Sequence, residues 1–304
     1  MRFDARRFVS GSLRHYLRLN AALALGVAVA TAVLTGALLV GDSVRGSLRD
    51  TALDRLGKID VVLTGERFFR ETLAEELFAA PGVKEQFAQI TPGVLLPATL
   101  ERPAVGDRPV RRLGQAQAIG APATFWQLGD ARLVGASESD PKTLAPPKPG
   151  EIVLNAEAAS GLEVQVGDDV ILRLPEIIQL PRDSSFAHKT DAVRSVRLKL
   201  SAIIESNGLG RFGLTPSQEI PRLAYVDVRT IQNTLEQYEA ARKLGFVNAL
   251  FVAGREGEAP SLAAAETLAK AVRPTLEDYG LKVASSPRGY LLVSSNRMLL
   301  DPAA

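Results

Sequence analysis

The feature that most limits how this chain can fold is an uncharged apolar stretch at residues 21–41, AALALGVAVATAVLTGALLVG. At about 1.5 Å of rise per residue, a helix of this length spans roughly 30 Å, the thickness of the hydrocarbon core of a bilayer. Its Leu and Val residues favour insertion enough to outweigh the interior Gly and Thr residues. We therefore predict a transmembrane helix that begins at Ala21 and ends at Gly41.

Two alternatives compete with a membrane span. A secretory signal peptide has an apolar core of about 7 to 15 residues followed by a small-residue cleavage site. Here the stretch is longer and is followed by Gly-Asp-Ser-Val-Arg. A buried helix of a soluble protein is the second alternative, but such helices rarely lack charge on every face over this length.

The flanks of the span predict its orientation. Residues 1–20 form a short basic amphipathic segment, which we expect to lie on the cytoplasmic face of the membrane. Most of the chain follows the span, and large domains cross a membrane largely regardless of charge. We therefore place the N-terminus in the cytoplasm and the domain outside. Small residues recur at four-residue spacing along the span, for example Gly26 with Ala30 and Ala32 with Gly36, a pattern that lets helices approach closely.

Composition argues against several classes of function. The chain of 304 residues has a formal net charge of +2 and interspersed charges, unlike a nucleic-acid-binding protein with a basic stripe. Cysteine is absent, which excludes disulfides, thiolate nucleophiles and Cys-based metal sites. The only histidines, His15 and His188, lie far apart in sequence, which argues against a His-based metal site or catalytic pair. We predict no catalytic, cofactor-binding or metal-binding residue.

Periodicity after the span predicts three parts. Residues 42–111 contain a stalk helix with apolar residues every fourth position, ended by Gly57, and then form a first α/β half. Residues 112–228 are rich in short strands and read as an inserted subdomain, and residues 229–304 form a second α/β half. The predicted fold class is α+β: one N-terminal transmembrane helix, then an extracytoplasmic α/β domain interrupted by a β-rich inserted subdomain.

The boundaries of the individual elements follow from the same patterns. Strands are expected at 59–64, 89–100, 112–119, 152–154, 169–174, 193–204, 223–228, 248–253 and 281–285. Helices are expected at 71–80, 155–161, 230–244 and 260–279. Polar stretches at 137–150 and 175–190 are expected to be exposed loops.

One glycine-rich stretch, NGLGRFG at residues 207–213, matches the dinucleotide fingerprint G-x-G-x-x-G. That fingerprint requires a helix to begin at the glycines so that its N–H groups meet the pyrophosphate. Pro216 and Pro221 argue against such a helix, and Leu214 stands where a P-loop has its lysine. We interpret the stretch as a flexible loop between strands, in which Arg211 and Phe212 are candidates for contact with a partner.

The tetrapeptide GDSV at residues 41–44 resembles the start of the GDSL hydrolase motif, in which a serine is the nucleophile. That chemistry needs a histidine to accept the serine proton. The sequence has no histidine after His188, and Ser185 stands where the family has an aspartate. Ser43 is more simply explained as a residue of a helix interface.

Several segments together resemble the MacB-like, FtsX-like family of ABC-transporter permeases. They are LLVGDSVRGSLRDTALDRLGKIDVVL after the span, QAIGAPATFWQL, GEIVLNAEAASGLEVQVGDDVILRLP, LKLSAIIE and LAYVDVRTIQNTL. The resemblance covers nearly the whole chain, and the V-G-D-D-V turn at residues 166–170 is its best single match.

The resemblance implies an α/β domain split by a β-rich insertion, located outside the bacterial inner membrane. It implies a separate cytoplasmic ABC ATPase subunit that drives helix motions, so this chain would not itself be an enzyme. It also implies three further spans after the domain, so we expect an N-terminal portion of a permease or a remainder encoded elsewhere. The small-residue pattern of the span suggests contact with further permease spans or with a second copy in a dimer. A single-span anchored binding or scaffold module and an anchored serine hydrolase stay open as alternatives.

Overall fold

The computed structural model describes residues 5–135, 144–175, 193–215, 217, 219–235, 245–255, 262–276, 278, 281–285 and 290–295. Residues 137–143 of the predicted loop at 137–150 and residues 176–190 of the predicted loop at 175–190, including His188, lie outside the described residues. The chain divides into two compact units, Met1–Leu53 and Asp54–Ala304. The last residues of the stalk helix thus belong to the second unit.

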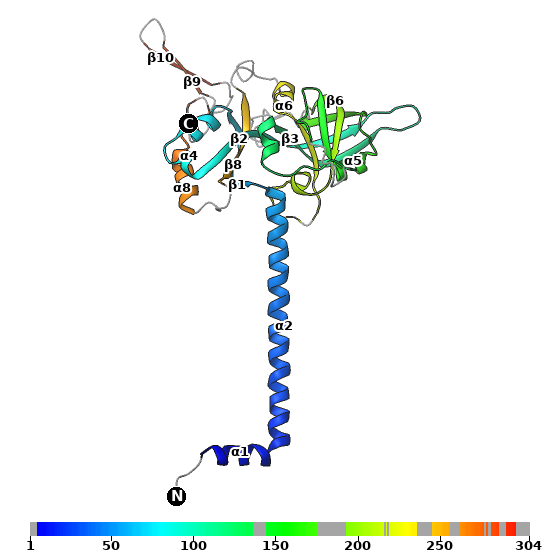
Figure 1. Cartoon of the computed structure of the whole chain (residues 1–304). Coiled ribbons are helices and arrows are strands. Elements are labelled where there is room, and N and C mark those ends of the chain that lie inside the picture. Colours follow the sequence, from blue (N-terminus) through cyan, green and yellow to red (C-terminus); the bar gives the residue numbers. More distant parts are fainter. Residues whose placement is uncertain are drawn as a thin grey trace, which may run out of the picture. The chain divides into compact units, whose positions relative to one another are not determined.

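The described part of the first unit consists of helix α1 (Ala5–His15) and the greater part of helix α2 (Leu17–Leu56). Figure 1 shows α2 as one continuous helix. By length and composition α2 can cross a membrane, and its most apolar window is 0% buried. This exposure does not fit the alternative of a buried core helix. The predicted continuation of the helix beyond residue 41 is confirmed, because α2 runs without interruption to Leu56 and Gly57 follows with a φ of 58°.

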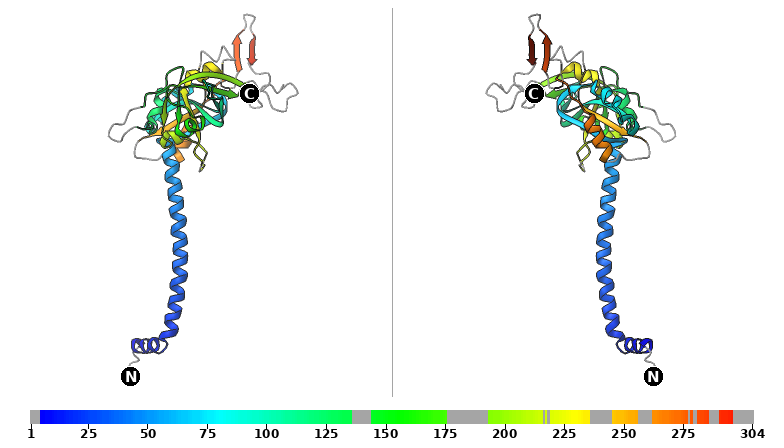
Figure 2. Two further views of the ribbon diagram at one scale, coloured as in Figure 1. Left: turned by 90° about the vertical axis from the view of Figure 1, so that its right-hand side faces the viewer. Right: turned by 90° about the vertical axis from the view of Figure 1, so that its left-hand side faces the viewer.

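The second unit is built on a sheet of eight strands in the order β1-β8-β2-β3-β7-β4-β6-β5. Their bounds are β1 (Ile59–Arg70), β2 (Phe87–Arg102), β3 (Arg111–Ala121), β4 (Glu151–Asn155), β5 (Asp169–Pro175), β6 (Val193–Ile204), β7 (Arg222–Asp227) and β8 (Phe246–Gly254). A separate two-stranded sheet pairs β9 (Leu281–Ser285) with β10 (Leu291–Ser295), as Figure 2 shows.

Strand β2 joins the two parts of this sheet. Its first half pairs with β8, from Phe87 to Gly93, and its second half pairs with β3. Thr99, Leu100 and Glu101 also pair with β5, so that β2, β3, β7, β4, β6 and β5 form a closed ring. Closure leaves these six strands without a free edge. The predicted β-rich insertion at 112–228 is not confirmed as a separate body, because this ring takes part of β2 from before residue 112.

Five short α-helices of the unit lie within the described residues. They are α3 (Leu73–Ala79), α4 (Val83–Gln86), α5 (Ala156–Leu162), α6 (Val228–Thr234) and α8 (Leu262–Ala271). The predicted helix at 260–279 is too long, because α8 stops before Pro274, whose ring disfavours helical backbone in the preceding residues. The predicted helix at 230–244 is α6 at its start, and residues 236–244 lie outside the described part of the chain.

Two hydrophobic clusters fill the domain. The larger contains apolar side chains of β2, β5, β6, β8 and the packed faces of α3, α5 and α8. The smaller is aromatic at its centre, where Phe125, Phe212, Tyr225 and Phe251 are all 0% exposed. Residues of β7 and β8 alternate between the two clusters along each strand, as the two faces of a strand require.

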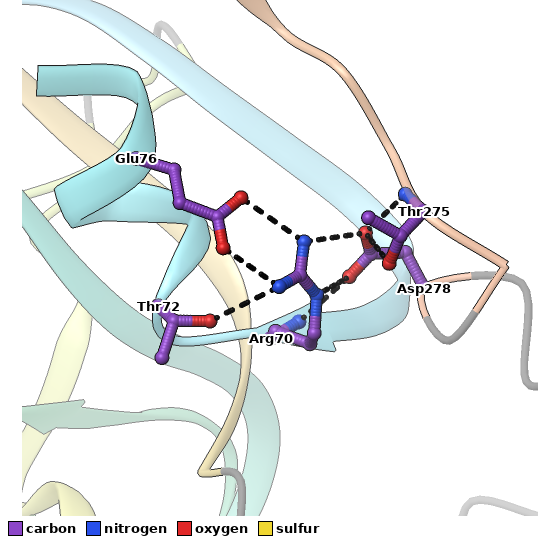
Figure 3. A network of polar contacts seen from close by, with 5 residues as sticks. All are labelled: Arg70, Thr72, Glu76, Thr275 and Asp278. Atoms are coloured by element: carbon purple, nitrogen blue, oxygen red, sulfur yellow. Dashed lines mark hydrogen bonds and ion pairs between the residues drawn. The ribbon is translucent and has the colours of Figure 1, made fainter. Parts of the chain in front are cut away.

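A polar network joins segments more than two hundred positions apart (Figure 3). Arg70, at the end of β1, donates from Nε to Asp278 Oδ1 at 3.0 Å and from Nη1 to Glu76 Oε1 at 2.8 Å. It also donates to Thr72 Oγ1 at 3.3 Å, while Asp278 Oδ2 accepts from the backbone N–H of Thr275 at 2.7 Å. Arg70 and Asp278 are 8% and 9% exposed, so the pair is buried. The network holds the segment after α8 against the end of β1.

The charges of the network stabilise one another. Hydrogen bonds to Glu76 and Asp278 raise the pKa of Arg70. Burial alone would raise the pKa of Asp278, but hydrogen bonds from the Arg70 side chain and from the backbone N–H groups of Thr275 and Arg70 bring it below its ordinary value. The ionised form of Asp278 is therefore the one that the fold binds.

Replacing Asp278 by alanine should lower the free energy of unfolding by about 3 kcal/mol, because it removes the buried partner of Arg70 and leaves only the half-exposed Glu76 as its ion pair. Glu76→Ala is the matched control, since the Glu76 side chain is 50% exposed and an exposed partner contributes about 1 kcal/mol or less. Chemical denaturation of the full chain in detergent measures both values. Equal losses in the two variants would contradict this account.

The same pair predicts a dependence of stability on pH. Because the folded-state pKa of Asp278 is lowered, its contribution is fully present above the unfolded-state pKa of about 3.9 and is lost as the pH falls through the folded-state value. Asp278→Asn should therefore lose less stability than the natural chain as the pH falls below about 3.9.

Candidate functional site: the end of helix α2

The end of α2 is bound to the rest of the sheet unit by hydrogen bonds to two loops. The Asp54 carboxylate accepts from the backbone N–H of Gly208 at 3.2 Å, and Arg55 Nη2 donates to the carbonyl oxygen of Ser217. Immediately after the helix, the Lys58 N–H donates to the carbonyl of Leu128 at 2.6 Å. Two loops that are distant in sequence thus hold three of five consecutive residues at the end of the helix.

Glycines make this close packing possible. Gly57 has a φ of 58°, and a Cβ atom there would lie 2.4 Å from the carbonyl oxygen of Leu128. Gly208 has a φ of 47°, and a Cβ there would lie 2.5 Å from the carbonyl oxygen of Asp130. A residue with a side chain would be strained at either position and would also overlap backbone. The backbones of the helix end and of both loops therefore lie in direct contact.

The glycine-rich stretch at 207–213 is a buried structural element. Gly208–Arg211 forms a 3₁₀ helix in which Gly208, Leu209 and Gly210 are buried. A Cβ at Gly210 would lie 1.8 Å from the carbonyl oxygen of Glu205, which explains this glycine by packing. No α-helix begins there, so the dinucleotide geometry is not formed. The stretch connects strands β6 and β7, as predicted, but it contains a buried 3₁₀ helix.

The side chain of Asn155 also holds this stretch by a hydrogen bond. This residue is 0% exposed and caps α5, where its Oδ1 accepts from the N–H of Ala158 at 3.1 Å. Its Nδ2 donates to the carbonyl oxygens of Gly210 at 2.9 Å and Pro221 at 2.7 Å. The Tyr225 hydroxyl donates to the carbonyl of Leu209, and burial raises the pKa of Tyr225 well above its ordinary value. The loop that receives α2 is therefore fixed to β4, α5 and β7.

Beneath the helix end lies the aromatic cluster, against which Leu56 packs. The rings of Phe125 and Phe212 meet edge to face with centroids 5.8 Å apart, and those of Phe125 and Phe251 are 5.1 Å apart. Such pairs contribute about 0.5–1.5 kcal/mol beyond their burial. Phe212 is 0% exposed, so its predicted role in partner contact is wrong: the side chain is an anchor of the core.

Two cations lie near one another at this site. Arg55 lies after the predicted span and is 6% exposed. Its burial, and to a smaller extent the positive charge of Arg211, lower the pKa of its guanidinium. The side chain of Arg211 is half-buried rather than projecting from a loop tip, and its contact with a partner stays a prediction. Among the described residues, no group of three or more His, Asp or Glu side chains is placed to hold a metal ion.

The predicted span residues occupy the exposed part of α2. Ala21 and Ala30 are exposed, and no atom lies within 4 Å of a Cβ position at Gly26, Gly36 or Gly41, apart from neighbouring backbone of the helix itself. Their small-residue surface is therefore open to lipid or to another helix. Ser43 lies inside the same continuous helix, not at the sharp turn that exposes a hydrolase nucleophile.

Sequence reasoning missed the residues that receive the helix. Gly57 was predictable as a helix end. The contacts of Asp54, Arg55 and Asp130 were not predictable from neighbouring residues, because their partners lie far along the chain. The density of glycine at 208–213 was the available sign of close packing.

No protein-family model matches the sequence, and no curated protein matches it. Among solved structures, the periplasmic region of MacB from Actinobacillus actinomycetemcomitans is similar with a TM-score of 0.41 and 12% sequence identity. The match covers 72% of this chain and 86% of that one. A score this low does not establish a shared fold, so function has to be inferred from the contacts of this chain.

Gly57→Ala should destabilise the unit strongly, because the new methyl group meets both an unfavourable φ and the carbonyl of Leu128. We expect a loss of about 3 kcal/mol or more in the free energy of unfolding. Trp126 is the only tryptophan of the chain and packs against the aromatic cluster, so its fluorescence reports the transition.

Gly106→Ala is the matched control for this experiment. Its φ of 56° is nearly the same, but no atom lies within 4 Å of its Cβ position. We expect the control to lose only about 1 kcal/mol, the cost of the left-handed conformation alone. A Gly57→Ala variant no less stable than Gly106→Ala would contradict the importance of the close approach.

Proposed function

We propose that the chain is the N-terminal part of an ABC-transporter permease subunit. In this proposal residues 21–41 cross the bacterial inner membrane, the N-terminus lies in the cytoplasm and the sheet unit lies in the extracytoplasmic space. The observation that carries it is the end of α2: the helix that contains the apolar span continues to Leu56, and its last turn is hydrogen-bonded into the sheet unit.

The proposed role of this arrangement is mechanical. An uninterrupted helix transmits an axial displacement better than a flexible linker, because each turn is held by its own hydrogen bonds. Displacement of Asp54 and Lys58 would pull on Gly208 and Leu128. Leu128 belongs to the aromatic cluster, as does Leu209, the residue after Gly208. Since that cluster includes residues of β3, β4, β7 and β8, the displacement would reach both parts of the sheet and any substrate or partner bound to it.

The cytoplasmic end offers a surface for the motor subunit. Helix α1 exposes Phe8 and Leu13 together with Arg14, a combination suited to the membrane surface and to a partner helix. We propose that a separate ABC ATPase subunit binds here and that this chain itself hydrolyses no ATP. The small residues of α2 would contact further permease spans or a second copy in a dimer.

A single-span binding or scaffold module is the alternative. It uses the same anchored domain but needs no ATPase and no motion of α2. The two functions therefore differ in whether an ATPase subunit contacts α1 in the native membrane.

The test is photo-crosslinking in membranes of the source cells, with a photoreactive amino acid at Leu13 of the full chain. We expect a covalent adduct with a protein that carries an ABC ATPase domain, identified by mass spectrometry. The control position is Val166, which is 60% exposed in the sheet unit and should give no ATPase adduct because it lies across the membrane.

Absence of an ATPase adduct from Leu13, with crosslinks to lipid alone, would contradict the permease proposal and favour the anchored module. An ATPase adduct from Val166 would contradict the proposed orientation.

A further inference from the structure

An open pocket of about 430 Å³ lies between the β2–β3 hairpin and the end of α5. It is lined by Arg102, Asp107, Arg108, Pro109, Val110, Arg111 and Glu163. Its volume lies within the range of small-molecule sites, roughly 300–1,000 Å³. Three of the seven lining residues are arginines, so the pocket can place several planar N–H donors around one guest.

Arg102 forms the buried wall of this pocket. The residue is 5% exposed, and its Nη1 and Nη2 donate to the carbonyl oxygens of Glu163 at 3.0 Å and Pro109 at 3.1 Å. Its Nε is buried without a hydrogen-bond partner among the described residues. A buried guanidinium with unused donor capacity favours a negatively charged neighbour.

The side chain of Glu163 shows that these arginines bind a carboxylate. Its carboxylate receives a hydrogen bond from Arg111 Nη1 and lies 3.7 Å from Arg102 Nη1. The Glu163 side chain is nevertheless 60% exposed, so water or a solute can replace it. Its backbone has a φ of 55°, a left-handed conformation that is uncommon for a residue with a side chain. A carboxylate of the chain itself thus occupies the arginines from an exposed position.

Arg108 supplies a further donor at the rim. Its side chain is 56% exposed, and its ion pair with Asp168 is long at 3.9 Å. Long exposed pairs contribute little, so reorienting Arg108 toward a guest costs little. Pro109 and Val110 add an apolar wall beside these charges.

We propose that this pocket binds a small organic acid, whose carboxylate or phosphate group takes the place of the Glu163 carboxylate against Arg102 and Arg111, with Arg108 closing on it. The apolar part of the guest lies against Pro109 and Val110. The inference is independent of the permease proposal, because it uses only residues of the sheet unit.

The experiment is isothermal titration of the full chain in detergent with four probes. Benzoate and phenyl phosphate carry an acid on an apolar ring, inorganic phosphate carries the acid alone, and benzyl alcohol is the neutral analogue. We expect benzoate or phenyl phosphate to bind at least about tenfold more tightly than benzyl alcohol. The stronger of the two identifies the preferred acid, and comparison with inorganic phosphate measures the contribution of the ring.

Three variants identify the site. Arg108→Gln should weaken binding of the better acid about tenfold, while Arg273→Gln, at an exposed arginine outside the pocket, should leave it unchanged. Glu163→Gln should strengthen binding several-fold, because it removes the competing charge. If Glu163→Gln lowers the unfolding midpoint, Glu163→Gly replaces it, since glycine accepts a φ of 55°.

Three results would overturn the proposal. The first is acids that bind no better than benzyl alcohol. The second is equal effects of Arg108→Gln and Arg273→Gln. The third is acid binding that is unchanged or weaker when the Glu163 carboxylate is removed.

Discussion

The contact between the backbone of Gly57 and the carbonyl of Leu128 determines how this chain is built. It lets the Lys58 N–H reach Leu128 at 2.6 Å, directs the chain from α2 into β1, and positions Asp54 to accept from Gly208. A side chain at position 57 would move the helix end away from Leu128 and so disturb the Lys58–Leu128 bond, the Asp54–Gly208 bond and the path of the chain into β1. The apolar span and the sheet unit are covalently continuous in any case, but this contact is what makes the end of the helix a packed part of the sheet unit.

Within the sheet unit, single strands contribute to more than one part of the structure. Strand β2 serves two sets of partners along its length, and β7 and β8 contribute to both hydrophobic clusters. The Arg70–Asp278 pair adds a charged connection between the end of β1 and the segment after α8. A force applied at Asp54 would therefore act on a unit whose two sheet parts share strand β2 and whose two hydrophobic clusters share strands β7 and β8. This is the physical basis for proposing that the domain responds to motion of α2.

Local patterns in the sequence predicted the local features. The uncharged run at 21–41, the stalk periodicity and the helix end at Gly57 were all readable, because a helix depends on neighbours three and four positions apart. The pairing of β2 with β5 was not, since it brings Thr99 against Arg173 without any local signal. Gly208 and Gly210 resembled a phosphate loop because sequence shows that glycine is needed but not which atoms approach it. Phe212 was misassigned for the same reason: its partners, Phe125 and Phe251, come from other elements.

The most direct test of the account is amide hydrogen exchange of the full chain in lipid nanodiscs at increasing denaturant. If the end of α2 is part of the core, the amides of Lys58, Gly208 and Leu209 will open with the same free energy as those of β8. If the helix end is only tethered, these amides will exchange with the lower opening free energy of the exposed stalk at residues 44–50, while β8 stays protected. That result would contradict the proposal that motion of α2 is transmitted to the domain.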